Sequence, residues 1–453
     1  MEVHVVSKQD ISQHATFSLP ASATLGKLGP SSVRIRPQIV SLGANNLSYA
    51  MLGTALKWWD LYPVQENYPA PYNDSSKWGI APAWGFSAVV ESTIPEIAPE
   101  TLLYGIWPTT AVLTDMQLEK STPEGHWIET SPHRQTLMSL YNRYVEIPRS
   151  NPVCSLATSS LSNSPAAASP EEALNQLAWS SVFRTLWTCG YYLSEYVFQV
   201  HPDIKTPVHP LGNQFQLPWS EADADLSSAV VVSLGGSTKT ARTFAYFLER
   251  KEKKVAPLGF LQVTSAPVAL SEATKAANPS FPSKAIEYAD IESEETAEWL
   301  GQLNPSKIVV LEIGVRGDGL DKLLGSIKQN TALKSANVVI VKIGSPQKAL
   351  SAEEQAAAYQ QIEQLGKVQC NTSGMQDTAI QALGAEAFFN SMDVKWEKLY
   401  HDRNLWAADL KMVWGHGISG SDGIESGWTK ICHGEVGANE AMVYKLQEKP
   451  THS

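Results

Sequence analysis

The stretch from Ala229 to Leu248 constrains the fold of this chain more than any other part of it. Its first five residues are small, apolar and mostly β-branched, which is typical of a strand buried inside a sheet. Gly235 and Gly236 then allow a sharp turn. Ser237 or Thr238 can cap a helix, and apolar residues recur at helical spacing to the end of the stretch. A strand, a glycine turn and a helix N-terminus present free backbone N–H groups to a phosphate, so the stretch is a candidate nucleotide site.

Strand-like and helix-like segments alternate from this stretch onward. The expected strands are residues 229–233, 257–264, 285–288, 307–313, 337–343 and 367–370. The expected helices between them are residues 270–277, 292–303, 319–329 and 352–365. This alternation predicts an α/β fold with a doubly wound parallel sheet.

The rest of the chain has a different character. Residues 31–118 contain short strand-like runs with closely spaced turns, among them Val33–Arg36, Phe86–Ser92 and a hairpin within Thr101–Leu113, which predicts a small barrel or sandwich. A low-complexity loop at 155–170 precedes an expected helix from Pro170 to Val200. Residues 201–221 form a Pro-rich connector. The tail at 427–446 returns to expected short β segments with glycines, which indicates that the chain comes back to complete its first domain.

Composition narrows the classes of function. The net charge of -11 argues against nucleic acid as the main partner, because phosphate backbones require clustered Lys and Arg. The N-terminus lacks the pattern of a secretory signal, and no window approaches the length of a membrane span, so a cytoplasmic protein is expected. Cys154, Cys189, Cys370 and Cys432 are scattered and predict neither a disulfide framework nor a zinc knuckle.

The glycine turn fits two other motifs poorly. A nucleophile elbow needs G-x-S-x-G, but position 239 is Lys. A P-loop ends in Gly-Lys-Ser/Thr, and here Thr238 precedes Lys239 while Ser233 stands at the first glycine position. A hydrolase or a triphosphate site is therefore disfavoured. The role of His416, in a glycine-rich segment of the tail, stays open.

The order of the segments resembles that of the medium-chain dehydrogenase/reductase superfamily. More closely, the chain resembles the DUF2855 family, a zinc-free, quinone oxidoreductase-like branch. The residues that carry this resemblance are Gly43–Ala50, Trp58–Asp60, Pro82–Phe86, Tyr104-Gly105, Ser237–Ala241 and the tail at 423–446. The resemblance implies a GroES-like β-rich catalytic domain plus a Rossmann domain. It places the first part of the GroES-like domain at 1–168, the Rossmann-type domain with its bridging helix at 169–385, and the returning segment at 386–453.

The same resemblance implies a zinc-independent reductase that uses NADPH. The cysteine and the Gly-His-Glu of zinc-dependent relatives are missing, with Trp84-Gly85-Phe86 at the corresponding corner. The second expected strand ends at Thr264-Ser265 without the acid that would repel a 2′-phosphate, so NADPH is favoured over NADH. Three glycines of the family turn are replaced by Ser237, Thr238 and Thr240, which leaves the occupancy of the site open. The candidate cofactor residues are Ser233, Gly235, Gly236, Ser237, Thr238, Lys239, Thr240, Thr264, Ser265 and Gly314.

Candidate catalytic residues come from the first domain. By the resemblance, Asn45, Asn46 and Tyr49 lie on a turn that faces the nicotinamide, where a tyrosine hydroxyl can donate a proton; a purely structural turn is the alternative. Trp58, Trp59, Tyr62 and Trp84 are candidates for an apolar substrate pocket, or are simply core.

The expected function is reduction of an apolar conjugated enone or ketone, for example a polyketide-like secondary metabolite. The alternatives are a cofactor-independent cyclase or lyase on the same fold, and a non-catalytic small-molecule-binding protein. The expected partner is a small apolar substrate, with neither nucleic acid nor a membrane, and the resemblance leaves room for a homodimer through an edge strand at 337–343.

Overall fold

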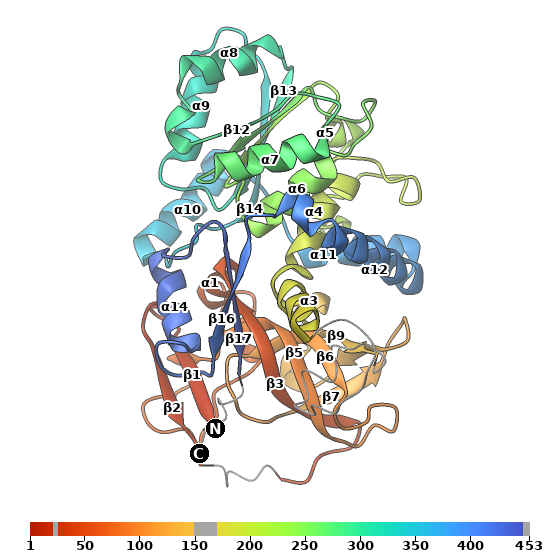
Figure 1. The fold of residues 1–453 in the computed structure, drawn as a ribbon, viewed down its shortest axis with the longest axis vertical. Coiled ribbons are helices and arrows are strands. Elements are labelled where there is room, and N and C mark those ends of the chain that lie inside the picture. Colours follow the sequence, from red (N-terminus) through yellow and green to blue (C-terminus); the bar gives the residue numbers. More distant parts are fainter. Residues whose placement is uncertain (21–25, 149–169, 447–453) are drawn as a thin grey trace.

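A six-stranded parallel sheet forms the upper half of the molecule in Figure 1. The computed structural model describes residues 1–20, 26–148 and 170–446; the predicted loop at 155–170 lies outside them except for its last residue. The strand order is β12-β11-β10-β13-β14-β15, which is the Rossmann order. These strands are β10 (Ala229–Leu234), β11 (Gly259–Val263), β12 (Ser283–Ile286), β13 (Lys307–Ile313), β14 (Asn337–Gly344) and β15 (Val368–Gln369). The predicted doubly wound sheet is confirmed.

Helices follow the strands of this sheet as the sequence predicts. They are α6 (Lys239–Leu248), α7 (Pro267–Ala277), α8 (Glu294–Gln302), α9 (Gly319–Gln329) and α10 (Ala352–Gln364). Helix α7 begins three residues earlier than expected, because Pro267 occupies the first turn, where its missing N–H costs nothing. The expectation that the strand at 337–343 is the edge strand of the sheet is wrong. The short strand β15 pairs with β14 at Val341 and Lys342 and is itself the outermost strand.

A closed ring of antiparallel strands forms the lower half of the molecule. Its strands are β3 (Ser32–Leu42), β5 (Pro82–Ser92), β6 (Leu102–Pro108), β7 (Thr114–Lys120), β8 (His126–Glu129) and β9 (Arg143–Ile147). The order β3-β5-β6-β9-β8-β7 closes where β7 pairs with β3. This is the GroES-like half of the α/β fold. The expected hairpin within Thr101–Leu113 is wrong, because the single strand β6 pairs with β5 and β9 instead.

The C-terminal tail returns to this lower half. Strand β17 (Glu440–Lys445) runs antiparallel to β3, and β16 (Lys411–His416) pairs parallel with β17. A parallel pair needs a crossover, which α14 (Ile424–His433) supplies. The prediction of short β segments at 427–446 is therefore wrong for residues 427–433, which belong to α14, and right for β17. Ile424, Trp428 and Ile431 recur at helical spacing and are all buried.

A small N-terminal sheet was absent from the sequence prediction. Strand β1 (Glu2–Ser7) lies between β2 (His14–Ser18) and β4 (Trp78–Gly79). Its apolar residues Val3, Val5 and Val6 are completely buried. The sheet thereby packs the first residues of the chain against the barrel.

Helices in the middle of the molecule connect the two halves (Figure 1). The expected single helix from Pro170 to Val200 consists of α3 (Pro170–Phe183), α4 (Leu186–Tyr192) and a π-helical turn at Leu193–Val197. The remaining α-helices of the described residues are α1 (Ala44–Met51), α5 (Glu221–Ala224), α11 (Thr372–Leu383), α12 (Ala385–His401) and α13 (Arg403–Trp406). One buried apolar cluster runs from the barrel through α3, α4 and α12 into the Rossmann sheet. In the described part of the chain, no helix is both long enough and apolar enough to cross a membrane.

Candidate functional site

The turn between β10 and α6 has the geometry that the sequence predicts. Gly235 has φ +90°, and a side-chain carbon there would collide with the carbonyl oxygen of Ile313. Thr238 is the N-cap, and its hydroxyl accepts a hydrogen bond from the backbone N–H of Ala241 at 3.3 Å. Other first-turn N–H groups of α6 have no partner within the helix, because no preceding turn exists. The turn therefore offers donors to an anion.

Two other strand ends lie beside this turn. Strand β10 has β11 on one side and β13 on the other, so the crevice at the carboxyl ends of these strands is the switch point of the sheet. Thr264 and Ser265 follow β11, the former buried and the latter exposed. Gly314 follows β13 with φ +82°, and a side-chain carbon there would lie 3.6 Å from Cγ2 of Thr238. The predicted cofactor residues are thus brought to one edge of the sheet.

Two further residues at this edge were not predicted. Tyr288 follows β12, and its buried hydroxyl has no hydrogen-bond partner among the described residues. Burial raises the pKa of this hydroxyl, while the neighbouring backbone and charge of Arg316 and the backbone of Gly235 oppose the shift. Arg316 is exposed two residues after Gly314. A single Tyr after a short strand gives no sequence signal, so Tyr288 could not have been predicted. Arg316 could have been, because a cation two residues after the glycine that ends β13 is typical of a residue that contacts a phosphate.

The two cations of α6 contact the returning tail. The ammonium group of Lys239 donates to the backbone oxygen of Glu440 at 2.9 Å, and burial lowers the pKa of Lys239 to about 8. Arg242 forms two hydrogen bonds to Asp409, at 2.8 and 2.7 Å, and its Nε donates to the backbone oxygen of Ser237 at 3.0 Å. Lys239 is therefore a link between the two halves of the molecule in this structure, rather than a free phosphate ligand.

The predicted catalytic tyrosine lies in an aromatic cluster. Tyr49 is on helix α1, not on the turn that the sequence predicts, because strand β3 ends at Leu42 and the helix begins at once. The Tyr49 hydroxyl accepts a hydrogen bond from Nε1 of Trp84 at 2.8 Å. Its ring meets those of Trp58 and Tyr141 edge-on, at centroid distances of 4.9 and 5.9 Å. Burial raises the pKa of Tyr49, while Trp84 and Asn45 oppose the shift.

The aromatic cluster contains one donor without a well-aligned partner. This donor is Nε1 of Trp58, which is buried and has no such partner within the described residues. The Tyr141 hydroxyl is the group placed to accept from this N–H, because the Trp58 N–H opposes the rise in the pKa of Tyr141 that burial causes. Trp58 and Trp84 therefore remain together as candidate pocket residues.

The other predicted residues have structural partners. Asn46 is fully buried; its amide oxygen accepts from Gly43 N at 2.8 Å, and its nitrogen donates to Pro82 O at 2.8 Å, so it fixes the start of α1 to β5. Trp59 belongs to a different core cluster from Trp58 and packs onto Gly53 and Gly79. Tyr62 donates to Ile106 O at 2.7 Å, and Arg134 covers its ring. Asn46 and Trp59 therefore lie apart from Tyr49, whereas Tyr62 belongs to the same buried apolar cluster as Tyr49, Trp58 and Trp84.

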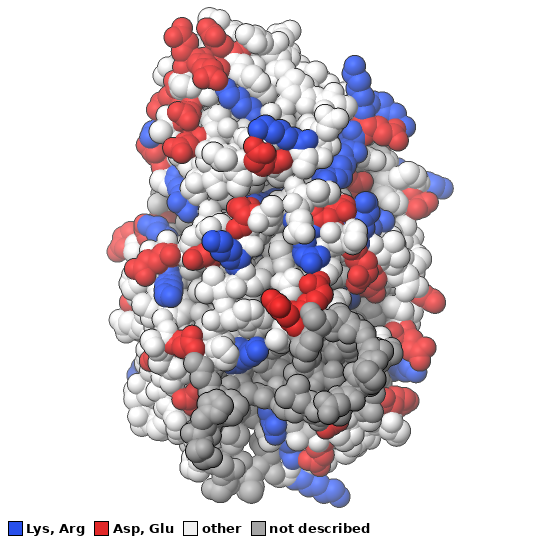
Figure 2. Space-filling view, viewed as in Figure 1, with Lys and Arg blue, Asp and Glu red and all other residues white. Residues whose placement is uncertain are grey.

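Charge and metal-ligand patterns add little to the site. Acidic and basic side chains intermingle over the face shown in Figure 2. Within the described ranges, no three His, Cys, Asp or Glu side chains are grouped so that they could hold a metal ion. His416 is paired with Asp422, its Nδ1 lying 3.3 Å from the carboxylate.

Comparisons with known proteins give one family and several distant structures. A family model described as "Protein of unknown function (DUF2855)" matches residues 40–437. Among curated proteins, none matches the chain. A crystal structure of CurA from Vibrio vulnificus in complex with NADPH is 9% identical, with a TM-score of 0.44 over 99% of this chain and 100% of that chain. A mutant enoyl thioester reductase from Candida tropicalis is 10% identical, with a TM-score of 0.46 over 98% and 99%. The mitochondrial 2-enoyl thioester reductase Etr1p/Etr2p heterodimer from the same organism is 10% identical, with a TM-score of 0.46 over 98% of this chain and 99% of that chain.

Proposed function

The chain belongs to the DUF2855 family, and we propose that it is a zinc-independent reductase that transfers a hydride from NADPH to an apolar conjugated enone or ketone. A fold of this kind hosts many chemistries, so the proposal depends on the site and not on the architecture. The observation that carries it is the switch-point edge of the Rossmann sheet. There, a tight glycine turn, a capped helix N-terminus and Tyr288 lie at the carboxyl ends of adjacent strands.

The strand ends favour NADPH over NADH. No acidic side chain follows β11 directly, where Thr264 and Ser265 stand, so nothing there would repel a 2′-phosphate. Arg316 is exposed at the end of the neighbouring strand β13 and offers a planar cation to the same phosphate. The backbone N–H groups of Gly235 and Gly236 donate to the carbonyl oxygen of Val263, so the two glycines would only let the pyrophosphate approach, and Ser237 with the helix start at Thr238 and Thr240 would hold it.

The aromatic cluster would receive the substrate and supply the proton. NADPH supplies a hydride when it is bound, and reduction of the conjugated carbonyl then requires one proton. Tyr49 would give it, because its hydroxyl accepts the bond from Trp84 that fixes its position and keeps its own hydrogen to donate. Nε1 of Trp58, which has no well-aligned partner within the described residues, would donate to the carbonyl oxygen of the substrate. The rings around these two groups match an apolar, polyketide-like molecule.

Replacing Tyr49 with Phe should slow NADPH-dependent turnover about 100-fold or more while leaving KM within about threefold, because only proton donation is removed. The measurement is steady-state oxidation of NADPH with a panel of apolar enones. Tyr104→Phe is the matched control: its hydroxyl is also buried and bonded, to Thr185 at 2.9 Å, and its ring lies 5.9 Å from that of Trp84. That variant should keep its turnover. Full activity of Tyr49→Phe would remove Tyr49 from the mechanism.

A second candidate function is a cofactor-independent cyclase or lyase. The contacts of Lys239 and Arg242 favour it, since both cations of α6 are held by the tail rather than left for a phosphate. In that case an apolar substrate should turn over at the aromatic cluster without NADPH. Activity that is unchanged when NADPH is omitted would select this candidate over the reductase.

A further inference from the structure

Two of the four cysteines of this chain lie in contact although they are 181 residues apart in the sequence. The Sγ atoms of Cys189 and Cys370 are separated by 4.0 Å. Cys189 is on helix α4, which belongs to the bridge between the two halves, and Cys370 directly follows β15 of the Rossmann sheet. We propose that this pair is a reversible thiol–disulfide site, which fastens the bridge to the sheet when the protein meets a peroxide.

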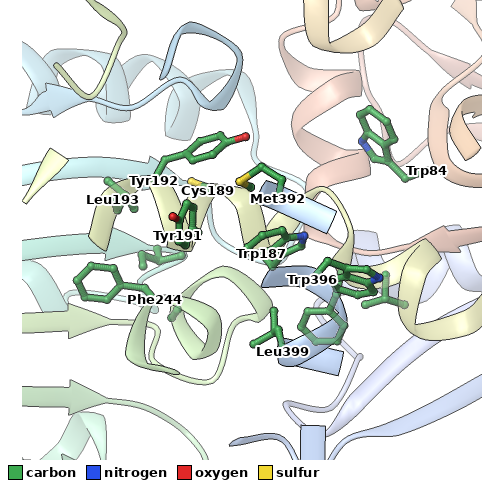
Figure 3. Packing of buried hydrophobic residues seen from close by; sticks show 14 of the residues in the cluster. Trp84, Trp187, Cys189, Tyr191, Tyr192, Leu193, Phe244, Met392, Trp396 and Leu399 are labelled. Atoms are coloured by element: carbon green, nitrogen blue, oxygen red, sulfur yellow. The ribbon is translucent and has the colours of Figure 1, made fainter. Parts of the chain in front are cut away.

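The surroundings of the two thiols differ in a way that suits this reaction. Cys189 lies inside the buried cluster shown in Figure 3, close to Tyr192 and Leu193 in the chain, and is 6% exposed. Cys370 is half-buried as a residue, and its hydrogen bond to Cys189 together with burial raises the pKa of its thiol well above the usual value. The sulfur atoms are already at van der Waals distance, and bond formation brings them about 2 Å closer, to the 2.05 Å of a disulfide.

The chemistry balances with hydrogen peroxide as the oxidant. The thiolate of Cys189 attacks one peroxide oxygen; the O–O bond breaks, and a sulfenic acid on Cys189 and one water form. The sulfur of Cys370 then attacks that of Cys189; the S–O bond breaks, and hydroxide leaves with the thiol proton of Cys370 as a second water. The two thiols lose two electrons, and the peroxide gains them. Hydrogen bonds donated by Cys370 and Thr372 lower the pKa of Cys189, which favours its role as the thiolate that attacks the peroxide.

The bond would join elements that position the candidate site. Helix α4 packs tightly on α6 at Gly190, where a side-chain carbon would lie 2.5 Å from Oγ1 of Thr243 and 2.6 Å from the backbone nitrogen of Phe244. Helix α6 starts at the turn described above. Closing a loop of this length restricts the unfolded chain, so the oxidised protein should be more stable than the reduced one.

The test is peptide mapping of the full chain after exposure to a few equivalents of hydrogen peroxide. Alkylation of free thiols, digestion and mass spectrometry should give a cross-linked peptide containing Cys189 and Cys370, which dithiothreitol separates. The melting temperature should rise by about 5 °C on oxidation and return on reduction. Recovery of both residues as free thiols, or as separate sulfinic acids without a cross-link, would overturn the proposal.

Serine variants provide the controls. Cys189→Ser and Cys370→Ser should abolish both the cross-link and the rise in melting temperature. Cys432→Ser should preserve them, since that thiol is buried elsewhere and donates to Ile11 O at 3.6 Å. Cys154→Ser should do the same. If Cys189→Ser does not fold, the wild-type peptide map and Cys370→Ser still decide the question. A peroxide-induced cross-link between other cysteines that forms in both Cys189→Ser and Cys370→Ser, with the same rise in melting temperature, would also contradict the proposal.

Discussion

Gly235→Ala is expected to destabilise the protein by about 3–5 kcal/mol and to abolish NADPH binding. Two costs combine at this position. Its φ of +90° is unfavourable for any residue with a side chain, which costs about 1–3 kcal/mol. The new methyl group also collides with the backbone oxygen of Ile313, which cannot rotate away as a side chain can. Urea unfolding followed by tryptophan fluorescence measures the first effect, and titration with NADPH measures the second.

Gly236→Ala is the matched control for this prediction. A methyl group at Gly236 would meet Cδ1 of Leu270 at 3.0 Å and Cβ of Gln262 at 3.3 Å. Cδ1 is the far end of a flexible side chain, and the φ of Gly236 is not positive, so the expected cost is about 1 kcal/mol. Equal loss of stability in the two variants would contradict the role assigned to Gly235 in the turn.

Arg242→Ala should lower the free energy of unfolding by about 3–5 kcal/mol, the range for breaking a buried ion pair by removing one partner. The Arg242 side chain is only 1% exposed and holds both oxygens of Asp409. Its Nε also fixes the backbone oxygen of Ser237 within the cofactor turn. The substitution therefore loosens the tail and the turn together, and urea unfolding is again the measurement.

Arg250→Ala is the control for the arginine substitution. Arg250 follows the same helix, is exposed, and contacts only the carbonyl oxygen and the ring of Tyr246 among the contacts described for it. Its removal should cost about 1 kcal/mol or less. If Arg242→Ala unfolds at the same urea concentration as Arg250→Ala, the ion pair with Asp409 does not hold the two halves together.

The Rossmann half was predictable because its pattern is local. Strand β13 and helix α9 have the bounds expected from the sequence, Lys307–Ile313 and Gly319–Gln329. A strand buried on both faces reads as one apolar run, and glycines mark where it ends. Helix α14 was missed although Ile424, Trp428 and Ile431 carry a helical period, because Gly427 and Gly434 suggested turns. Gly427 is needed for another reason: the ring of Tyr444 packs directly against it.

The candidate site was less predictable because its contacts are not local. The bond from Lys239 to the backbone of Glu440 joins residues 201 positions apart, and no pattern near either residue indicates it. The Tyr49 hydroxyl and the Trp84 nitrogen meet across two elements in the same way. Residue type alone could propose Trp59 as a pocket residue beside Trp58, but only the fold separates the two, by placing Trp59 in another core cluster against Gly53 and Gly79.

Binding of NADPH tests the central claim most directly. The protein has 14 tryptophans, so excitation of tryptophan should transfer energy to bound nicotinamide and raise its emission as NADPH is added. The account predicts a saturable signal, tighter for NADPH than for NADH because Thr264 and Ser265 replace an acid after β11. Gly236→Ala should retain the signal and Gly235→Ala should lose it. Absence of a saturable signal with millimolar NADPH in the folded wild-type protein would contradict the reductase assignment.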